Sequence, residues 1–106
     1  MTAMLHEVAI PDSLYRVVTK LTHQPEVETA LAVAVKELIR LRLKELDAER
    51  IVFEAKYGMT FAQFDSRFQA EEIPDQYSYA VESDYFDWEA AVTSVAYLEE
   101  LSATIL

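Results

Sequence analysis

Residues that could act in catalysis are few and lie apart in this chain. Its two histidines, His6 and His23, fall in different predicted elements, and no cysteine is present as nucleophile or thiolate ligand. Neighbouring carboxylates such as Glu71 and Glu72 point apart on a helix and do not converge on a metal. The single glycine cannot build a phosphate-binding loop. We therefore expect no enzyme activity, no cofactor and no metal site.

Negative charge and aromatic residues are concentrated in the second half. Residues 58–106 hold one basic residue, Arg67, against ten acidic ones, whereas residues 1–57 hold eight against nine. Nine of the twelve aromatic residues also lie in the second half. Such a surface suits a basic protein partner, because charge steers the encounter and buried aromatic side chains supply affinity. The alternative is that the aromatic residues form the protein's own core and the carboxylates solvate its outside.

Length and composition indicate one mainly helical domain. The chain has 106 residues, 52% of them hydrophobic, with one glycine and three prolines, so tight hairpins are few. Its start lacks the features of a signal peptide, and no apolar run approaches the roughly 20 residues that span a bilayer. We expect a cytoplasmic protein. Residues 1–57 are predicted to dimerise, and residues 58–106 to bind a partner.

The front of the chain predicts a strand followed by a helix. Apolar residues alternate over residues 4–10, which is typical of a strand that Pro11 ends. Asp12 or Ser13 can then cap a helix over residues 14–22.

A long helix is predicted next, over about residues 26–57. Its length would be on the order of 45 Å, more than a small monomeric protein needs. A helix of this length with a wide apolar face usually packs against a second copy or a partner. We expect a homodimer in which these residues pack: Val8, Ile10, Leu14, Val18, Leu31, Val35, Leu38 and Ile39.

Several start and stop signals define the back of the chain. Gly58 suits the left-handed position after a helix, and Thr60 with Gln63 forms a capping box for a short helix over residues 61–68. Met59 and Phe64 form a hydrophobic staple. Residues 74–83 are predicted to be a loop, and a last helix is predicted from residue 83 or 84 to 102.

The strand, the helix, the break at residues 22–25 and the next helix resemble the ribbon-helix-helix family over about residues 4–44. In that family two chains pair their strands into a ribbon that reads DNA. The outward positions here are Leu5, Glu7 and Ala9, which lack the polar and basic side chains that contact bases. The resemblance therefore implies the dimer fold, while we expect weak DNA binding. The opposing possibility is that Arg16, Lys20, Lys36 and Lys44 cluster in the dimer and contact DNA instead; no DNA-binding residue is assigned.

The remainder resembles the C-terminal region of small prokaryotic antitoxins over about residues 56–89. The residues that carry this resemblance are Lys56-Tyr57-Gly58-Met59-Thr60, Phe61, Phe64, Ile73-Pro74-Asp75 and Asp84-Tyr85-Phe86-Asp87-Trp88-Glu89. It implies a back half that covers a small toxin encoded by an adjacent gene. Many such toxins are basic, which agrees with the charge count.

The resulting hypothesis is an antitoxin of a toxin–antitoxin system that dimerises and neutralises a basic toxin through its acidic half. The expected partner-binding residues are Phe61, Phe64, Phe68, Asp84, Tyr85, Phe86, Asp87, Trp88 and Glu89. Trp88 is the expected anchor, although it could equally be the core of a helical hairpin. Two alternatives stay open: a DNA-binding autorepressor of the ribbon-helix-helix type, and a structural helical dimer with no toxin partner.

Overall fold

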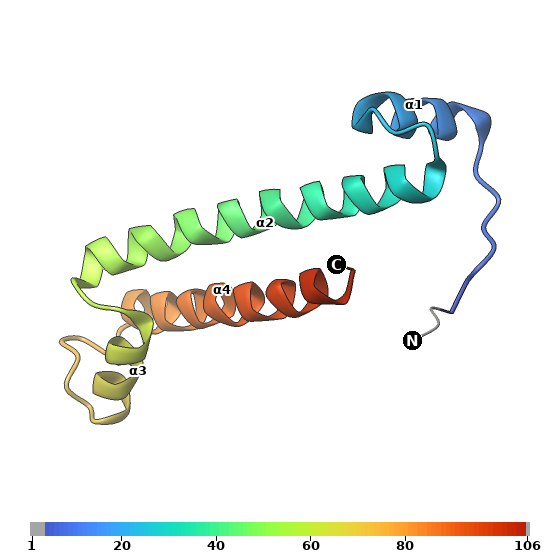
Figure 1. Ribbon diagram of the computed structural model, residues 1–106. Coiled ribbons are helices and arrows are strands. Elements are labelled where there is room, and N and C mark those ends of the chain that lie inside the picture. Colours follow the sequence, from blue (N-terminus) through green and yellow to red (C-terminus); the bar gives the residue numbers. More distant parts are fainter. Residues whose placement is uncertain (1–3, 106) are drawn as a thin grey trace. The chain divides into compact units, whose positions relative to one another are not determined.

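The computed structural model of the protein describes residues 4–105 and is mainly helical, as predicted (Figure 1). The described part contains four helices: α1 (Asp12–Thr22), α2 (Val27–Tyr57), α3 (Phe61–Gln69) and α4 (Tyr79–Thr104). The chain forms two compact units, Met1–Leu38 and Ile39–Leu106, which divide inside α2. Unit 1 contains α1 and the first part of α2. Unit 2 contains the rest of α2 together with α3 and α4.

The predicted N-terminal strand is wrong. Residues 4–11 form no regular element, and residues 4–105 contain no strand at all. A strand exists only where its backbone groups pair with those of another strand, and alternation of apolar residues does not supply that second strand. Met4, Leu5 and Val8 are accordingly exposed.

Helix α1 begins two residues earlier than predicted and has no side-chain cap. Pro11 is the N-cap residue, with φ −55° and ψ 144°, so the predicted capping by Asp12 or Ser13 is wrong. Asp12 instead lies in the first turn, where a carboxylate favours the positive end of the helix dipole. The helix ends at Thr22, and its C-cap residue His23 is left-handed at φ 55°.

The junction between α2 and α3 is formed as predicted. Gly58 has φ +67°, a left-handed conformation that ends α2, and its N–H still donates to the carbonyl of Glu54 at 2.7 Å. The capping box is present, because the Gln63 N–H donates to Thr60 Oγ1 at 3.3 Å and the Thr60 N–H donates to Gln63 Oε1 at 3.0 Å. Met59 packs against the hydrophobic cluster that contains Phe64.

Helix α4 starts at Tyr79, so the predicted start at residue 83 or 84 and the predicted loop over residues 74–83 are wrong in extent. Ser78 caps the helix, since its Oγ accepts from the Val81 N–H at 3.3 Å. The preceding turns are held by buried Gln76, whose Nε2 donates to the Phe68 carbonyl at 2.9 Å. The acidic residue in the first turn of α4 is therefore Glu82, and Asp84 lies beyond that turn.

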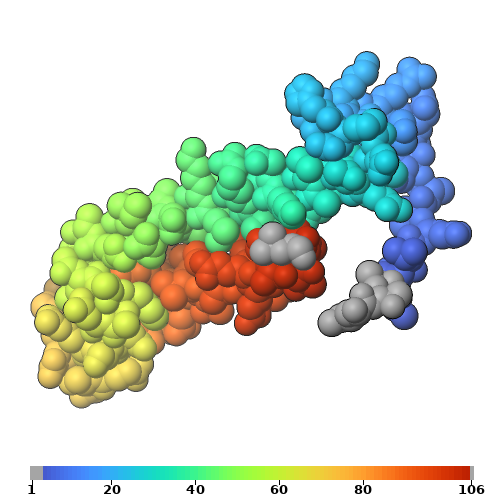
Figure 2. Space-filling model, in the orientation of Figure 1, coloured from blue at the N-terminus to red at the C-terminus, as the bar shows by residue number. Residues whose placement is uncertain are grey.

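The core of unit 2 is a cluster of aromatic rings around Trp88. The Trp88 ring lies 5.5 Å from Phe53, 5.8 Å from Tyr57, 5.4 Å from Phe61 and 5.1 Å from Phe64, between centroids. These rings come from α2, α3 and α4, so α3 closes the end of the hairpin that α2 and α4 form (Figure 2). Burial of large aromatic side chains supplies most of the stability of so small a core.

Unit 1 buries far fewer residues than unit 2 does. Ala30 is the one buried residue among its described residues, and α1 contributes none. The large apolar side chains of this unit that remain exposed include Val8, Leu14, Val17, Leu21, Leu31, Val35 and Leu38. The unit thus presents an apolar surface that its own residues do not cover.

Candidate partner-binding surface

Most of the predicted aromatic anchors lie in the core of unit 2. Trp88 and Phe64 are fully buried, and Tyr85 is 7% exposed. Phe61 and Phe68 are half-buried and pack against the same cluster. Trp88 therefore belongs to the core of a helical hairpin, which is the alternative that the sequence left open, and it is not accessible to a partner in this structure.

Asp84 is also engaged within the hairpin. Its Oδ2 accepts from Lys56 Nζ at 2.5 Å and from the Tyr57 hydroxyl at 2.6 Å, and its side chain is 18% exposed. Partial burial acts to raise the pKa of Asp84, but the hydrogen bonds from Lys56 and Tyr57 and the Lys56 charge outweigh it and hold that pKa below its ordinary value. The pKa of Tyr57 is raised, by burial and by its hydrogen bond to Asp84. This carboxylate stabilises the fold and is not an unpaired surface charge.

A second polar group joins α3 to α4. The Tyr85 hydroxyl donates to Asp65 Oδ1 at 2.6 Å, and Gln69 Nε2 donates to both side chains at 3.3 Å. The hydrogen bond to Asp65, with burial, raises the pKa of Tyr85 to about 12. Most of the residues that carry the antitoxin resemblance therefore have a structural place at the α2–α3–α4 junction.

Of the remaining predicted residues, Phe86 lies on the side of α4 opposite Trp88, and Asp87 and Glu89 lie about 100° from Trp88 on either side of it. Phe86 is 56% exposed, and Asp87 and Glu89 are exposed beside it. Tyr97 is 59% exposed and lies eleven positions after Phe86, which places both on one face of the helix. A shallow groove on this face is lined by Phe86, Glu89, Ala90, Thr93, Ser94 and Tyr97.

Tyr97 was not among the predicted binding residues. The signal that would have identified it is the spacing of Tyr79, Phe86 and Tyr97, which at about 100° per residue follows one line along α4, opposite Trp88.

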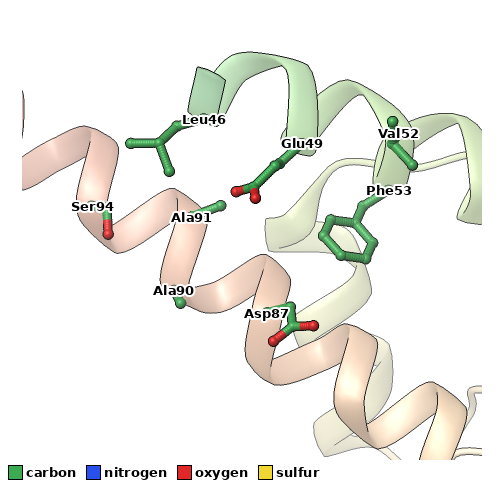
Figure 3. Close-up of a pocket in the computed structure, with 8 residues that line it drawn as sticks. All are labelled: Leu46, Glu49, Val52, Phe53, Asp87, Ala90, Ala91 and Ser94. Atoms are coloured by element: carbon green, nitrogen blue, oxygen red, sulfur yellow. The ribbon is translucent and has the colours of Figure 1, made fainter. Parts of the chain in front are cut away.

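A deeper groove of about 480 Å³ lies between α2 and α4 (Figure 3). It is lined by Leu46, Glu49, Val52, Phe53, Asp87, Ala90, Ala91 and Ser94. A further hollow is lined by Arg42, Glu45, Leu46, Ser94, Tyr97 and Leu98. Ser94 lines all three hollows, and Leu46, Ala90 and Tyr97 each line two of them. The three therefore form one continuous surface, called here the α2–α4 surface. Its α2 residues, Glu49 among them, were not predicted, because residues on two helices meet only once the hairpin is folded.

Acidic residues of unit 2 fall into two groups. Asp47 and Glu54 pair with Arg50 at 3.2 and 2.7 Å, Glu45 pairs with Arg42 at 3.6 Å, and Asp84 pairs with Lys56. By contrast, the side chains of Glu49, Asp87 and Glu89 make no hydrogen bond or ion pair with another residue of the described range 4–105. Glu49, Asp87 and Glu89 thus place three carboxylates without an internal partner on the α2–α4 surface, and other such carboxylates, Glu99 and Glu100 among them, lie outside it.

The predicted dimerisation residues are spread over exposed and half-buried positions. Val8, Leu14, Leu31, Val35 and Leu38 are exposed, Ile10 and Val18 are half-buried, and Ile39 is buried. Seven of the eight thus retain surface that a second copy could cover.

The described residues contain no group of three or more His, Asp or Glu side chains placed to hold a metal ion. None of the helices in that range is long and apolar enough to cross a membrane. No family model, curated protein or solved structure matches the chain.

Proposed function

We propose that this chain is an antitoxin-like protein that forms a homodimer and neutralises a basic toxin through its acidic C-terminal half. The observation that carries the proposal is the α2–α4 surface, where exposed Phe86 and Tyr97 lie beside carboxylates without an internal cation. Exposed aromatic side chains bordered by charge are typical of residues that dominate the affinity of an interface. The contact residues proposed now are Phe86, Asp87, Glu89 and Tyr97, while Trp88 supports them from inside.

The homodimer is supported by unit 1. A compact unit that buries one described residue and exposes ten large apolar ones has an incomplete core. A second copy covering the same surface would complete it, as in obligate dimers.

Recognition of DNA by a strand has no support in residues 4–105, because no strand is present there. We therefore do not propose the ribbon-helix-helix autorepressor. The structural dimer without a toxin differs from our proposal in one testable respect, since its α2–α4 surface would bind no basic protein.

The test is binding to the product of the adjacent open reading frame. That protein and this chain would be produced together, and the dissociation constant of the complex measured by calorimetry. We expect Phe86→Ala with Tyr97→Ala to weaken binding at least about 30-fold, because two exposed aromatic contacts at about 1 kcal/mol or more each are lost.

Ile51→Ala is the matched control, since Ile51 is 56% exposed on α2 but lies outside the α2–α4 surface. Its complex should retain the wild-type dissociation constant. Unchanged binding by the Phe86 and Tyr97 variant would reject this surface, and the absence of any complex with a basic neighbouring protein would reject the proposed function.

A further inference from the structure

The groove between α2 and α4 combines an apolar floor with two carboxylates. Figure 3 shows Glu49 reaching from α2 toward α4, Asp87 on α4, and the Phe53 ring between the two helices. Leu46, Ala90 and Ala91 complete the apolar lining, and Val52 is exposed at the groove. A ligand that fills such a groove needs an apolar stem and a positively charged end.

These carboxylates have no cationic partner among the described residues. Arg42, Arg50 and Lys56 of α2 pair with other carboxylates, namely Glu45, Asp47, Glu54 and Asp84. Neither Glu49 nor Asp87 is paired with a basic residue between positions 4 and 105. Two negative charges beside an apolar floor attract an external cation more strongly than two charges in open solvent, because the local dielectric constant is lower.

The chemistry of the groove favours arginine over lysine. A guanidinium group stacks on an aromatic ring and donates to two carboxylates from one planar fork, whereas an ammonium group is compact and strongly hydrated. Phe53 offers such a ring, and Glu49 and Asp87 offer carboxylates from two different helices. We infer that this groove receives an arginine side chain of the basic partner, an inference that rests on the proposed function and specifies how the partner is recognised.

The groove can be tested without the partner. The probe is Nα-acetyl-arginine N-methylamide, titrated into the isotope-labelled full-length protein and followed by the backbone amide signals. We expect saturable shifts at Glu49, Phe53, Asp87 and Ala91, and weaker ones with the corresponding lysine probe. The citrulline probe, which has nearly the same shape but no charge, should give none.

Two double variants distinguish binding in the groove from a general attraction to an acidic protein. The double variant Glu49→Gln, Asp87→Asn should lose the saturable shifts. The control, Glu99→Gln with Glu100→Gln, makes the same change of net charge at exposed positions of α4 that do not line the groove, and it should retain them. Shifts spread evenly over all acidic residues, equal binding of citrulline, or equal loss in both variants would overturn the inference.

Binding to the adjacent-gene protein distinguishes failure of the groove from failure of the function. If the groove binds an arginine of the partner, the groove variant should weaken that complex at least tenfold. The control variant should change its dissociation constant by less than about twofold. A partner that binds both variants as it binds the wild type would reject the groove and keep the proposed function. Saturable arginine binding with no basic protein partner would reject the proposed function and keep the groove.

Discussion

The hydroxyl of Tyr57 donates to Asp84 at 2.6 Å and joins the last residue of α2 to α4 across 27 positions of sequence. Lys56 donates to the same carboxylate oxygen from the neighbouring position. Tyr57 and Asp84, which both belong to the residues that carry the antitoxin resemblance, are therefore direct partners in the fold. These residues of the motif close the hairpin, and in the proposed function other residues of α4 contact the partner.

Asp84→Asn should destabilise the protein by about 1–2 kcal/mol at neutral pH, because a charged acceptor of two hydrogen bonds is replaced by a neutral one. The pKa of Asp84 is lowered in the folded state, so its contribution is complete above the ordinary carboxyl pKa of about 4 and is lost as the pH falls through the folded value. Urea denaturation at several pH values should show the wild type and variant converging below about pH 4. A constant difference down to low pH would contradict this role of the charge.

Tyr85 should make the protein sensitive to alkali. Its pKa is raised to about 12 in the folded state, so its contribution is complete below the ordinary tyrosine pKa of about 10 and is lost as the pH rises toward 12. Phenolate absorbance should reveal tyrosines that ionise late, and Tyr85→Phe should remove one of them. If Tyr85→Phe leaves the number of late-ionising tyrosines unchanged, the raised pKa does not belong to Tyr85.

Trp88→Ala should cost about 3–5 kcal/mol and unfold unit 2 under mild conditions, because it removes the side chain at the centre of the aromatic cluster. Phe86→Ala, two positions away, should change the free energy of unfolding by no more than about 0.5 kcal/mol, because Phe86 is exposed. Denaturant titrations of both variants check the pair. Similar losses in the two would contradict the assignment of one residue to the core and the other to the surface.

Gly58→Ala should destabilise the protein by about 1 kcal/mol through backbone conformation alone. A Cβ at this position would meet no atom within 4 Å, so the cost comes from φ +67° and not from a clash. Gly58→Asn should cost less, because asparagine tolerates the left-handed region better than alanine. Thermal unfolding of the two variants gives the order, and alanine at no cost would reject the argument.

Leu31→Lys should convert a homodimer into a monomer, since it places a charge on the apolar surface of unit 1 where a second copy would have to desolvate it. Light scattering at micromolar concentration gives the mass, and circular dichroism should show that the helices remain. Ile51→Lys is the control, because it changes an exposed apolar residue of unit 2. A wild-type protein that is only monomeric would remove the dimer from the proposed function.

Local signals in the sequence were sufficient where the structure is decided by neighbours in the chain. Gly58, Thr60 and Gln63 act on residues within one turn, and their prediction is confirmed. The start of α4 was misplaced because Ser78 has no glutamate or glutamine three residues later to complete a capping box. The predicted strand was wrong because a strand must pair with a second strand, and the sequence of residues 4–10 by itself does not provide one.

Assigning residues of α4 to the core or the surface requires their angular positions around the helix as well as the composition of the segment. Treating residues 84–89 as one aromatic and acidic cluster joined side chains that point in different directions. Phe86 and Trp88 are about 200° apart around α4. Because Trp88 lies in the core, Phe86 faces away from it. Glu49 could not be predicted at all, because only the packing of α2 against α4 places it in the same groove as Asp87.

Trp88 is the only tryptophan of the chain, and its indole N–H is buried without a hydrogen-bond partner in residues 4–105. An indole shielded from water emits fluorescence at short wavelength, so the protein carries one intrinsic optical reporter. Because the ring contacts α2, α3 and α4 within unit 2, its emission reports whether the hairpin is closed. A red shift on adding a partner would mean that the hairpin opens on binding, whereas constant emission would mean that recognition takes place on a hairpin that stays folded.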